Sequence, residues 1–336
     1  SAASDVYKRQ PYDCAVANTF YRKDVFEANS KDFEAEYGYR MEFTEDTTWK
    51  QVHEFTAFLK KLRESGKDVP YGYAQHHGTF AWTTQLDIQR MMFAHGRWLD
   101  WEIDDKLGSK TPPPSNWGDE QSVLLMQKFK DHADVCHPDN LANGTLELNT
   151  VYQAGDIAMQ VQYHEFAASI EDEKTSKAAG GRTGYAPCPK GEPSWIVNGG
   201  EAVNGTNCGI GGIGINGNAS EDIQRAAYIF CVYATSANLQ YDVLKGLGGT
   251  PTRKSVLERD DVKKAMNRPT DMPNALTFDA VYNHGIKDPH FVLGPKVPEG
   301  NEYHSIIAAE VQRCVAGESS AEETCNSIKS QIDDLH

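Results

Sequence analysis

The stretch whose residue types most directly suggest chemistry is residues 208–216, where four of nine residues are glycine. Three of these glycines match G-x-G-x-x-G, the pattern of loops that bind phosphate groups through backbone N–H groups. Such a loop needs an apolar strand before it and a helix that begins within it. Residues 201–207 are polar instead, and the next predicted helix begins only after Asn218. We therefore predict a crossing of the chain beside a ligand cleft, because glycine allows close backbone approach.

Other residue types that could support catalysis or metal binding occur only in weak arrangements. His76 and His77 are adjacent, and neighbouring side chains rarely point at one ion, so a polar pair in a loop is the simpler interpretation. Asp104-Asp105 and the acidic run 171–173 could act as acid and base, but such runs are usually solvated surface charges. The sequence contains no G-x-S-x-G, H-E-x-x-H or G-K-[ST] motif. It therefore predicts no metal site and no cofactor.

Aromatic and amide side chains accumulate instead in loops and at the ends of predicted strands. They are Tyr12, His77, Phe80, Trp82, Gln162, Tyr163, His164, Trp195 and Tyr303. Flat apolar rings beside hydrogen-bonding groups suit sugars, whose C–H faces pack on aromatic rings while their hydroxyl groups need donors and acceptors. An isolated aromatic residue is more often part of a core. For Trp82 and Tyr163, placement in polar, glycine-containing loops leaves core and ligand roles both open.

Periodic apolar residues outline the elements that must position these side chains. The clearest helix follows Thr48, which forms a capping box with Gln51, and it ends before Gly66. Asn218 is predicted to cap a later helix whose apolar face is Ile223, Ala226, Ala227, Phe230 and Ala234. Further helices are predicted near 86–93, 120–133, 302–316 and 320–334, and strands near 15–21, 71–74, 155–161 and 183–186. This alternation of short strands and helices predicts an α/β fold.

The composition limits the classes of partner. The 336 residues carry a formal net charge of −15, which disfavours nucleic acid because phosphate binding needs a basic surface. Hydrophobic residues make up 39% of the chain, which leaves room for two domains with separate cores. No run of 18 apolar residues could span a membrane. Residues 1–10 lack the apolar segment of a signal peptide, and we expect a foreign or disordered tail there.

Seven cysteines are more than a reduced bacterial protein of this size usually needs. Cys314 and Cys325 flank a turn between two predicted helices, and Cys188 and Cys208 bracket a loop rich in glycine, proline and asparagine. We predict a disulfide in each pair, hence an oxidising compartment; scattered free thiols are the alternative. Cys231 lies in an apolar helical pattern, so we expect it to be a buried free cysteine.

Several short motifs occur in an order that resembles a known family. They are Pro11-Tyr-Asp, Tyr21-Arg-Lys-Asp24, Thr48-Trp49 at a helix start, Gly155-Asp-Ile-Ala-Met159, Gly211-Gly-Ile-Gly-Ile215, Gly248-Gly-Thr-Pro-Thr-Arg-Lys-Ser255 and Ala316-Gly317 in a closing helical hairpin. No single motif is specific. Their order and spacing over residues 11–334 resemble the extracellular solute-binding proteins of ABC importers, in the sugar-binding cluster that includes maltodextrin-binding proteins.

The resemblance implies a two-lobe periplasmic-binding-protein fold of type II, whose lobes close on a ligand held between them. Residues 11–20 would form the first crossing between lobes, 21–208 the C-terminal lobe, 209–265 the return crossing with the remainder of the N-terminal lobe, and 266–336 the closing helices of the C-terminal lobe. The family's segment before Pro-Tyr-Asp has no counterpart here. We therefore expect a truncated lobe, exposed apolar surface and weak ligand binding.

The resemblance also implies a monomeric periplasmic or otherwise extracytoplasmic protein that captures a sugar or polyol for a membrane permease and performs no catalysis. Its cleft residues carry over as Tyr12, Asp13, His77, Thr79, Trp82, Gln162, Tyr163, His164, Gly211, Gly212, Arg253 and Tyr303. Ile213 replaces a ring that is common in the family, so stacking would depend on Trp82 and Tyr163.

Two alternatives stay open. One is a secreted glycoside hydrolase, for which Glu165 is the acidic residue near the cleft. The other is the same fold with a non-sugar solute.

Overall fold

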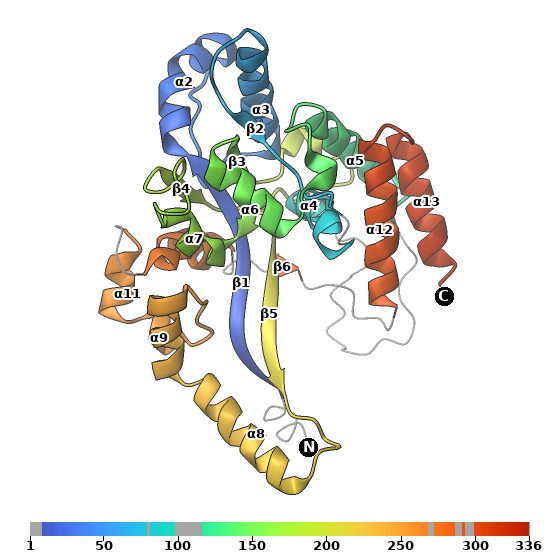
Figure 1. Ribbon diagram of the computed structural model, residues 1–336. Coiled ribbons are helices and arrows are strands. Elements are labelled where there is room, and N and C mark those ends of the chain that lie inside the picture. Colours follow the sequence, from blue (N-terminus) through green and yellow to red (C-terminus); the bar gives the residue numbers. More distant parts are fainter. Residues whose placement is uncertain are drawn as a thin grey trace.

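The computed structural model describes residues 9–78, 81–97, 116–267, 272–285, 291–292 and 299–335. Its strands are β1 (Arg9–Arg22), β2 (Tyr71–Tyr73), β3 (Ile157–Tyr163), β4 (Thr183–Ala186), β5 (Thr206–Gly214) and β6 (Phe291–Val292). Its longer helices are α2 (Lys23–Tyr37), α3 (Trp49–Glu64), α4 (Ala81–Ala94), α5 (Glu120–Ala133), α6 (Thr145–Ala154), α8 (Glu221–Ala234), α9 (Ala237–Leu247), α12 (Gly300–Val315) and α13 (Ala321–Asp333) (Figure 1). Shorter helical segments are η1 (Asn140–Ala142), η2 (His164–Phe166), α7 (Ala167–Glu171), η3 (Pro193–Trp195), α10 (Lys254–Leu257), α11 (Asp260–Ala265), η4 (Pro273–Thr277) and η5 (Asp279–Gly285).

One mixed sheet joins these strands in the order β2-β3-β1-β5-β6, and β4 also pairs with β1. β1 is antiparallel to β3, β4 and β5, whereas β2–β3 and β5–β6 are parallel pairs. Residues 9–16 of β1 pair with residues 208–214 of β5. They leave the body as a two-stranded ribbon, here called the ribbon, that reaches toward α8 (Figure 1). The glycine-rich stretch therefore lies in a strand, and not at the strand-to-helix turn that a phosphate loop needs.

Several elements follow from signals within a few residues. Thr48 and Gln51 form the predicted capping box, and α3 begins at the next residue, Trp49. α5 and β4 have the predicted bounds. The closing hairpin also forms, with a second capping box between Ser320 and Glu323. These predictions are confirmed because a cap satisfies the free N–H groups of its own helix, whatever the distant packing.

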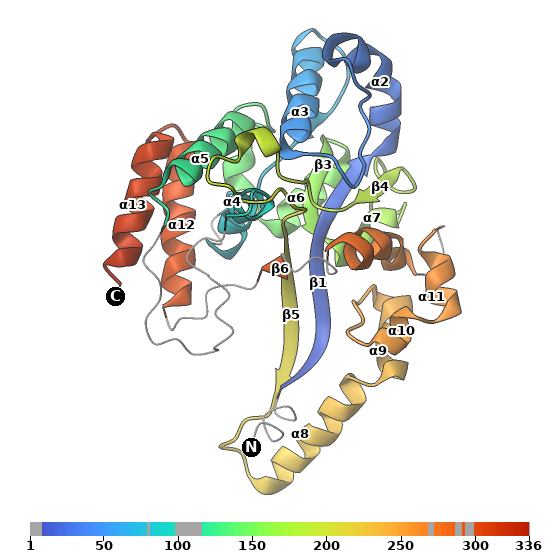
Figure 2. The same cartoon turned by 180° about the vertical axis from the view of Figure 1, so that it is seen from behind.

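The main core lies between the sheet and the helices on one side of it. Its members come chiefly from α2, α3, α4, α5, α12 and α13, with large side chains such as Trp49, Phe55 and Phe129 almost fully buried. Figures 1 and 2 show α4, α5, α12 and α13 gathered on one side of the ribbon and α9, α10 and α11 on the other. A smaller separate core around Leu244 and Phe278 holds this second group together.

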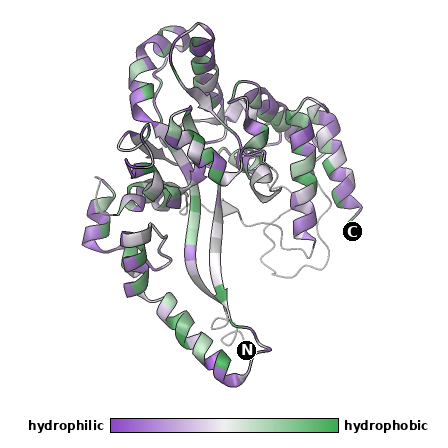
Figure 3. Ribbon diagram, in the orientation of Figure 1, coloured by the Kyte–Doolittle hydropathy of each residue, from purple (hydrophilic) through white to green (hydrophobic). Residues whose placement is uncertain are grey.

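α8 differs from the other long helices because its apolar side chains lie in solvent. Ile223 and Phe230, both on the predicted apolar face, are 61% and 59% exposed. Figure 3 shows the hydrophobic residues distributed along this helix. Its N-cap is Ser220 and not Asn218 as predicted, since the Asn216 side chain accepts the N–H of Asn218 and keeps that residue in the preceding turn. None of the helices described is long and apolar enough to cross a membrane.

The two predicted disulfides are wrong. Cys188, Cys314 and Cys325 are free, and Cys231 is a buried free cysteine as predicted. The Cys188 thiol donates to the carbonyl oxygen of Ala17, at 3.4 Å. Cys314 and Cys325 pack in the main core at the α12–α13 hairpin, where they behave as small apolar residues. The cysteines therefore give no evidence about the compartment.

Candidate ligand-binding site

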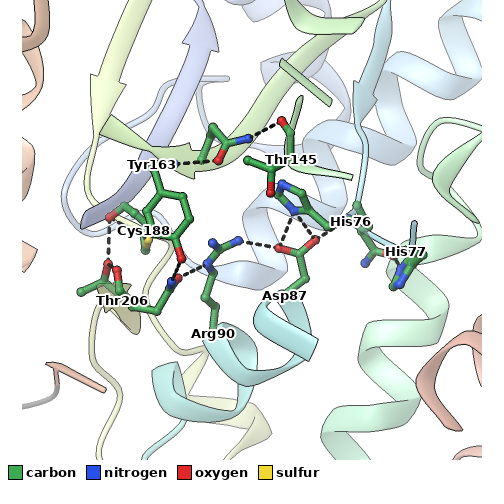
Figure 4. A network of polar contacts seen from close by, with 12 residues as sticks. His76, His77, Asp87, Arg90, Thr145, Tyr163, Cys188 and Thr206 are labelled. Carbon is green, nitrogen blue, oxygen red and sulfur yellow. Dashed lines mark hydrogen bonds and ion pairs between the residues drawn. The ribbon is translucent and has the colours of Figure 1, made fainter. Parts of the chain in front are cut away.

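A buried polar network lies where β3, β5 and α4 meet (Figure 4). The Asp87 carboxylate accepts from Arg90 at 2.6 Å and lies 3.1 Å from the His76 ring, and its Oδ2 also accepts the His76 backbone N–H. Arg90 donates onward to the Asn207 side chain at 2.6 Å. Asn207 in turn donates to the Tyr163 hydroxyl at 2.8 Å. The network joins four separate segments of the chain and fixes the orientation of Tyr163.

The charges within this network compensate one another. Burial would raise the pKa of Asp87, but the charges and hydrogen bonds of His76 and Arg90 outweigh it and hold that pKa well below its usual range. Asp87 and Arg90 are each 1% exposed, so the pair is shielded from solvent. Such a pair specifies geometry more than it adds stability. We read it as the rigid support of the site.

Three predicted site residues lie near this support, and each has at least one hydrogen-bond partner, although His77 Nδ1 and His164 Nε2 have none among the described residues. Gln162 donates to the Thr145 carbonyl at 3.0 Å and accepts the Tyr163 N–H at 2.9 Å. His77 is buried against Phe129, and its Nε2 lies 2.8 Å from the Gln75 amide oxygen. His164 Nδ1 accepts the Val16 N–H at 3.0 Å. Burial lowers the pKa of both histidines to about 4, so both are neutral at neutral pH.

A pocket of about 610 Å³ lies between the ribbon and helices α8 and α9. Two predicted site residues line it: Tyr12, whose ring is 49% exposed, and Asp13. The other lining residues are Glu165, Ile213, Phe230, Ala234, Leu239, Gln240, Val243, Gly248, Gly249, Thr250 and Pro251. Apolar side chains and rings thus surround a few polar groups, as is typical of sites for small ligands.

The pocket contains two carboxylates, Asp13 and Glu165, and none of the described residues that line it carries a positive charge. Burial, together with the charge of Asp13, raises the pKa of Glu165 to about 7. Burial also raises the pKa of Asp13, against the opposing effect of Thr250, whose N–H donates to Asp13 at 3.3 Å. The Thr250 hydroxyl lies near enough to favour the charged Asp13, yet it has no partner of acceptable hydrogen-bond geometry among the described residues.

Glycine residues of β5 lie along the ribbon beside the pocket. Asp13 pairs with Gly211, and a Cβ atom at Gly211 would lie 3.4 Å from the Asp13 Cβ. A Cβ atom at Gly209 would lie 3.8 Å from the Tyr163 ring. Gly212 is exposed on the same strand. Gly209 and Gly211 therefore share one face of β5, beside Tyr163 and Asp13 respectively.

The remaining predicted site residues are scattered. Thr79 lies outside the described residues, and Trp82 lies in α4 with a side chain that is not described. Arg253 is exposed and donates to the Thr235 carbonyl. Tyr303 is 1% exposed, within the main core. The structure thus brings Tyr12 and Asp13 to the pocket and Tyr163 and Gln162 to the network.

Sequence reasoning did not anticipate the network, although it placed Glu165 near the cleft. Asp87 and Arg90 are three residues apart on α4, so their spacing was a visible sign of an ion pair. Asn207 carries no local sign, because it lies 117 residues from Arg90. Glu165 was considered only as a possible acid. The described residues contain no group of three or more histidine, cysteine or acidic side chains that could hold a metal ion.

These features define a class of protein: an α/β protein with a partly apolar pocket beside a long two-stranded connection. Within that class, the chain belongs to the bacterial extracellular solute-binding protein family, which matches residues 10–270. The predicted family is therefore confirmed. The family and the solved neighbours are binding proteins and not enzymes, so the glycoside hydrolase alternative falls.

Solved structures share the predicted two-lobe fold. The maltose-bound MalE3 of T. maritima has a TM-score of 0.73 at 18% identity, with 98% of this chain and 73% of that chain covered. A solute-binding protein of Agrobacterium vitis S4 with bound D-mannitol has a TM-score of 0.74 at 19% identity, covering 98% and 72%. One from Agrobacterium radiobacter K84 with ribitol has a TM-score of 0.73 at 17% identity, covering 97% and 71%. None of the curated proteins compared with the chain matches it.

Proposed function

We propose that this protein captures a sugar or polyol in the pocket beside the ribbon, in a periplasmic or other extracytoplasmic compartment, and delivers it to an ABC permease as a monomer. The observation that carries the proposal is a pocket that combines a half-exposed ring with hydrogen-bonding groups, in a member of a solute-binding family. The similar proteins of known structure named above hold maltose, D-mannitol and ribitol.

The pocket offers both kinds of contact that a hydroxylated solute needs. The Tyr12 ring can pack on a C–H face, while Asp13, Glu165 and the Thr250 hydroxyl can bind hydroxyl groups. Gln240 has a supporting role, because its amide already bonds to Thr252 and to the Arg253 N–H and so fixes the loop 248–253. Tyr163 and His164 act as positioning residues, since their bonds hold β3 and η2 against β5 and β1. Gln162 also has a positioning role, because it ties the end of β3 to the start of α6.

Ligand capture would use movement about the ribbon. β1 and β5 connect the body to α8 and α9, so bending of these strands would move one wall of the pocket relative to Glu165. The glycines of β5 have no side chains, so bending of this strand would displace fewer atoms. On this proposal, residues 11–20 and 209–265 contain the crossings between lobes, as the resemblance implies.

The test is a binding series on the purified chain with maltose, D-mannitol, ribitol and related neutral solutes, measured by isothermal titration calorimetry and thermal shift. Tyr12→Ala should weaken binding of the best solute about tenfold, or roughly 1.4 kcal/mol. Tyr228→Ala is the matched control, because this tyrosine is 42% exposed on α8 and does not line the pocket. Equal affinity in the wild-type chain and Tyr12→Ala would move the site elsewhere.

A further inference from the structure

The pocket contains two partly buried carboxylates and no positively charged side chain. Among the described residues that line it, Asp13 and Glu165 are the only charged groups. Asp13 accepts the Thr250 N–H, and the Cys14 N–H and the Thr250 hydroxyl also favour its charged form, but none of these donors is a cation. Within the described part of the chain, Glu165 forms neither an ion pair nor a hydrogen bond. Burial of uncompensated charge is costly, so a partner of opposite charge is expected at this place.

The rest of the chain shows that this arrangement is unusual for the protein. The buried carboxylate of the polar network, Asp87, has Arg90 and His76 as partners. Glu310, which is mostly buried in α12, pairs with Arg313 at 3.0 Å. The two carboxylates that are more than nine-tenths buried among the described residues thus each have a cation beside them.

The half-buried carboxylates of Glu54, Glu171 and Glu192 have hydroxyl or N–H donors instead, and within the described ranges the Glu165 carboxylate has neither kind of partner. The absence of a cation beside Asp13 and Glu165, among the residues described, indicates that the cation comes from the solute.

The other walls of the pocket suit a compact organic cation. Tyr12 and Phe230 present aromatic rings, whose faces attract ammonium groups and also pack on C–H groups. Ile213, Leu239 and Val243 supply apolar surface. The Thr250 side chain is 3% exposed, and its hydroxyl, which has no partner of acceptable geometry among the described residues, lies beside the Asp13 carboxylate.

We propose that the solute carries a protonated amino group on a hydroxylated frame, as in an amino sugar or amino polyol, and that Asp13 and Glu165 bind this group together. The inference rests on the proposed function and narrows its solute class. Among the described residues, Asp13 from β1 is the one charged group that lines the pocket with Glu165, and α8, α9 and residues 248–251 contribute none. A bound cation would therefore favour the ionised Glu165 and displace its proton.

Matched probes test this proposal. D-Glucosamine is compared with D-glucose, and D-glucamine with sorbitol, by isothermal titration calorimetry at pH 7.5 and low salt, using the whole chain. Each amino probe should bind at least tenfold more tightly than its neutral partner. In Glu165→Gln this preference should fall to less than threefold. Glu34→Gln, at an exposed position on α2, is the matched control and should keep the full preference.

The possible outcomes distinguish a failure of the cation inference from a failure of the proposed function. A neutral probe that binds as tightly as its amino partner overturns the cation inference and leaves the proposed sugar or polyol function standing. A preference for amino probes that persists in Glu165→Gln places the cation elsewhere and also overturns it. If no probe of either class binds and Tyr12→Ala changes nothing, both the inference and the proposed function fail.

Discussion

Helices α3 and α8 have the same kind of sequence and opposite surroundings. Both have apolar residues at spacings of three and four, yet Phe55 of α3 is fully buried while Ile229 and Phe230 of α8 are 69% and 59% exposed. Figure 3 shows hydrophobic residues along α8, the helix at the end of the ribbon. The spacing predicts which side chains share a face. It does not predict whether that face is buried, because the residues that would pack on it are distant in the sequence.

The difference follows from what each helix packs on. α3 lies in the main core, against β2 and beside α2, with its apolar residues inside one continuous cluster. Only Cys231 and Ala234 of α8 are buried, near the end where the chain turns into α9. α8 therefore presents an exposed apolar surface. The chain spans 71–73% of the length of the three similar structures named above.

The largest difference in stability should appear when a phenylalanine ring is removed from α3 and, separately, from α8. Phe55→Ala should lower the free energy of unfolding by about 3–5 kcal/mol, because it leaves a cavity in a closely packed core. Phe230→Ala should cost less than about 1 kcal/mol, because the ring is mostly in solvent. Urea unfolding followed by circular dichroism measures both. Losses of similar size would show that α8 is packed as tightly as α3 and would remove the contrast.

Acid should act on the body through its buried histidines. His132 packs between Trp49 and Tyr73, and neither ring nitrogen has a hydrogen-bond partner among the described residues. Burial, helped by the charge of His53, lowers its pKa to about 3. Since the unfolded pKa is near 6.5, this group's contribution is fully present above pH 6.5 and is lost as the pH falls toward 3.

We therefore expect each such histidine to cost about 1.4 kcal/mol of stability for every pH unit below about 6.5. His132→Phe should make the unfolding midpoint less dependent on pH between 6.5 and 5. His137→Phe, at a half-buried ring, should change that dependence less. Urea midpoints at several pH values give the comparison. Parallel curves for wild type and His132→Phe would show that this ring is not the acid-sensitive group. Residues 221–247 contain no histidine, so the sensitivity belongs to the body.

Sequence reasoning succeeded where the interacting residues are close in the chain. Thr48 and Gln51 cap α3 within three residues, and Ser320 and Glu323 do the same for α13, so the signals are complete in a short window. It failed where partners are distant. Cys188 meets the Ala17 carbonyl, 171 positions away, and not Cys208. Glu165 reaches the pocket only because η2 follows β3 beside β1, a placement that the sheet register determines and the local spacing does not.

The smallest effect on stability should come from the exposed face of α8, and it makes the sharpest distinction between the regions. Ile229→Ser should change the free energy of unfolding by less than about 0.5 kcal/mol, because the side chain is 69% exposed. It should nevertheless reduce the binding of a hydrophobic dye and the rate of self-association, since it interrupts an apolar surface. Ile307→Ser, at a fully buried site in α12, should instead destabilise the chain and increase dye binding. If Ile229→Ser destabilises the protein as Ile307→Ser does, the face of α8 is covered in solution, by another molecule or by the chain itself.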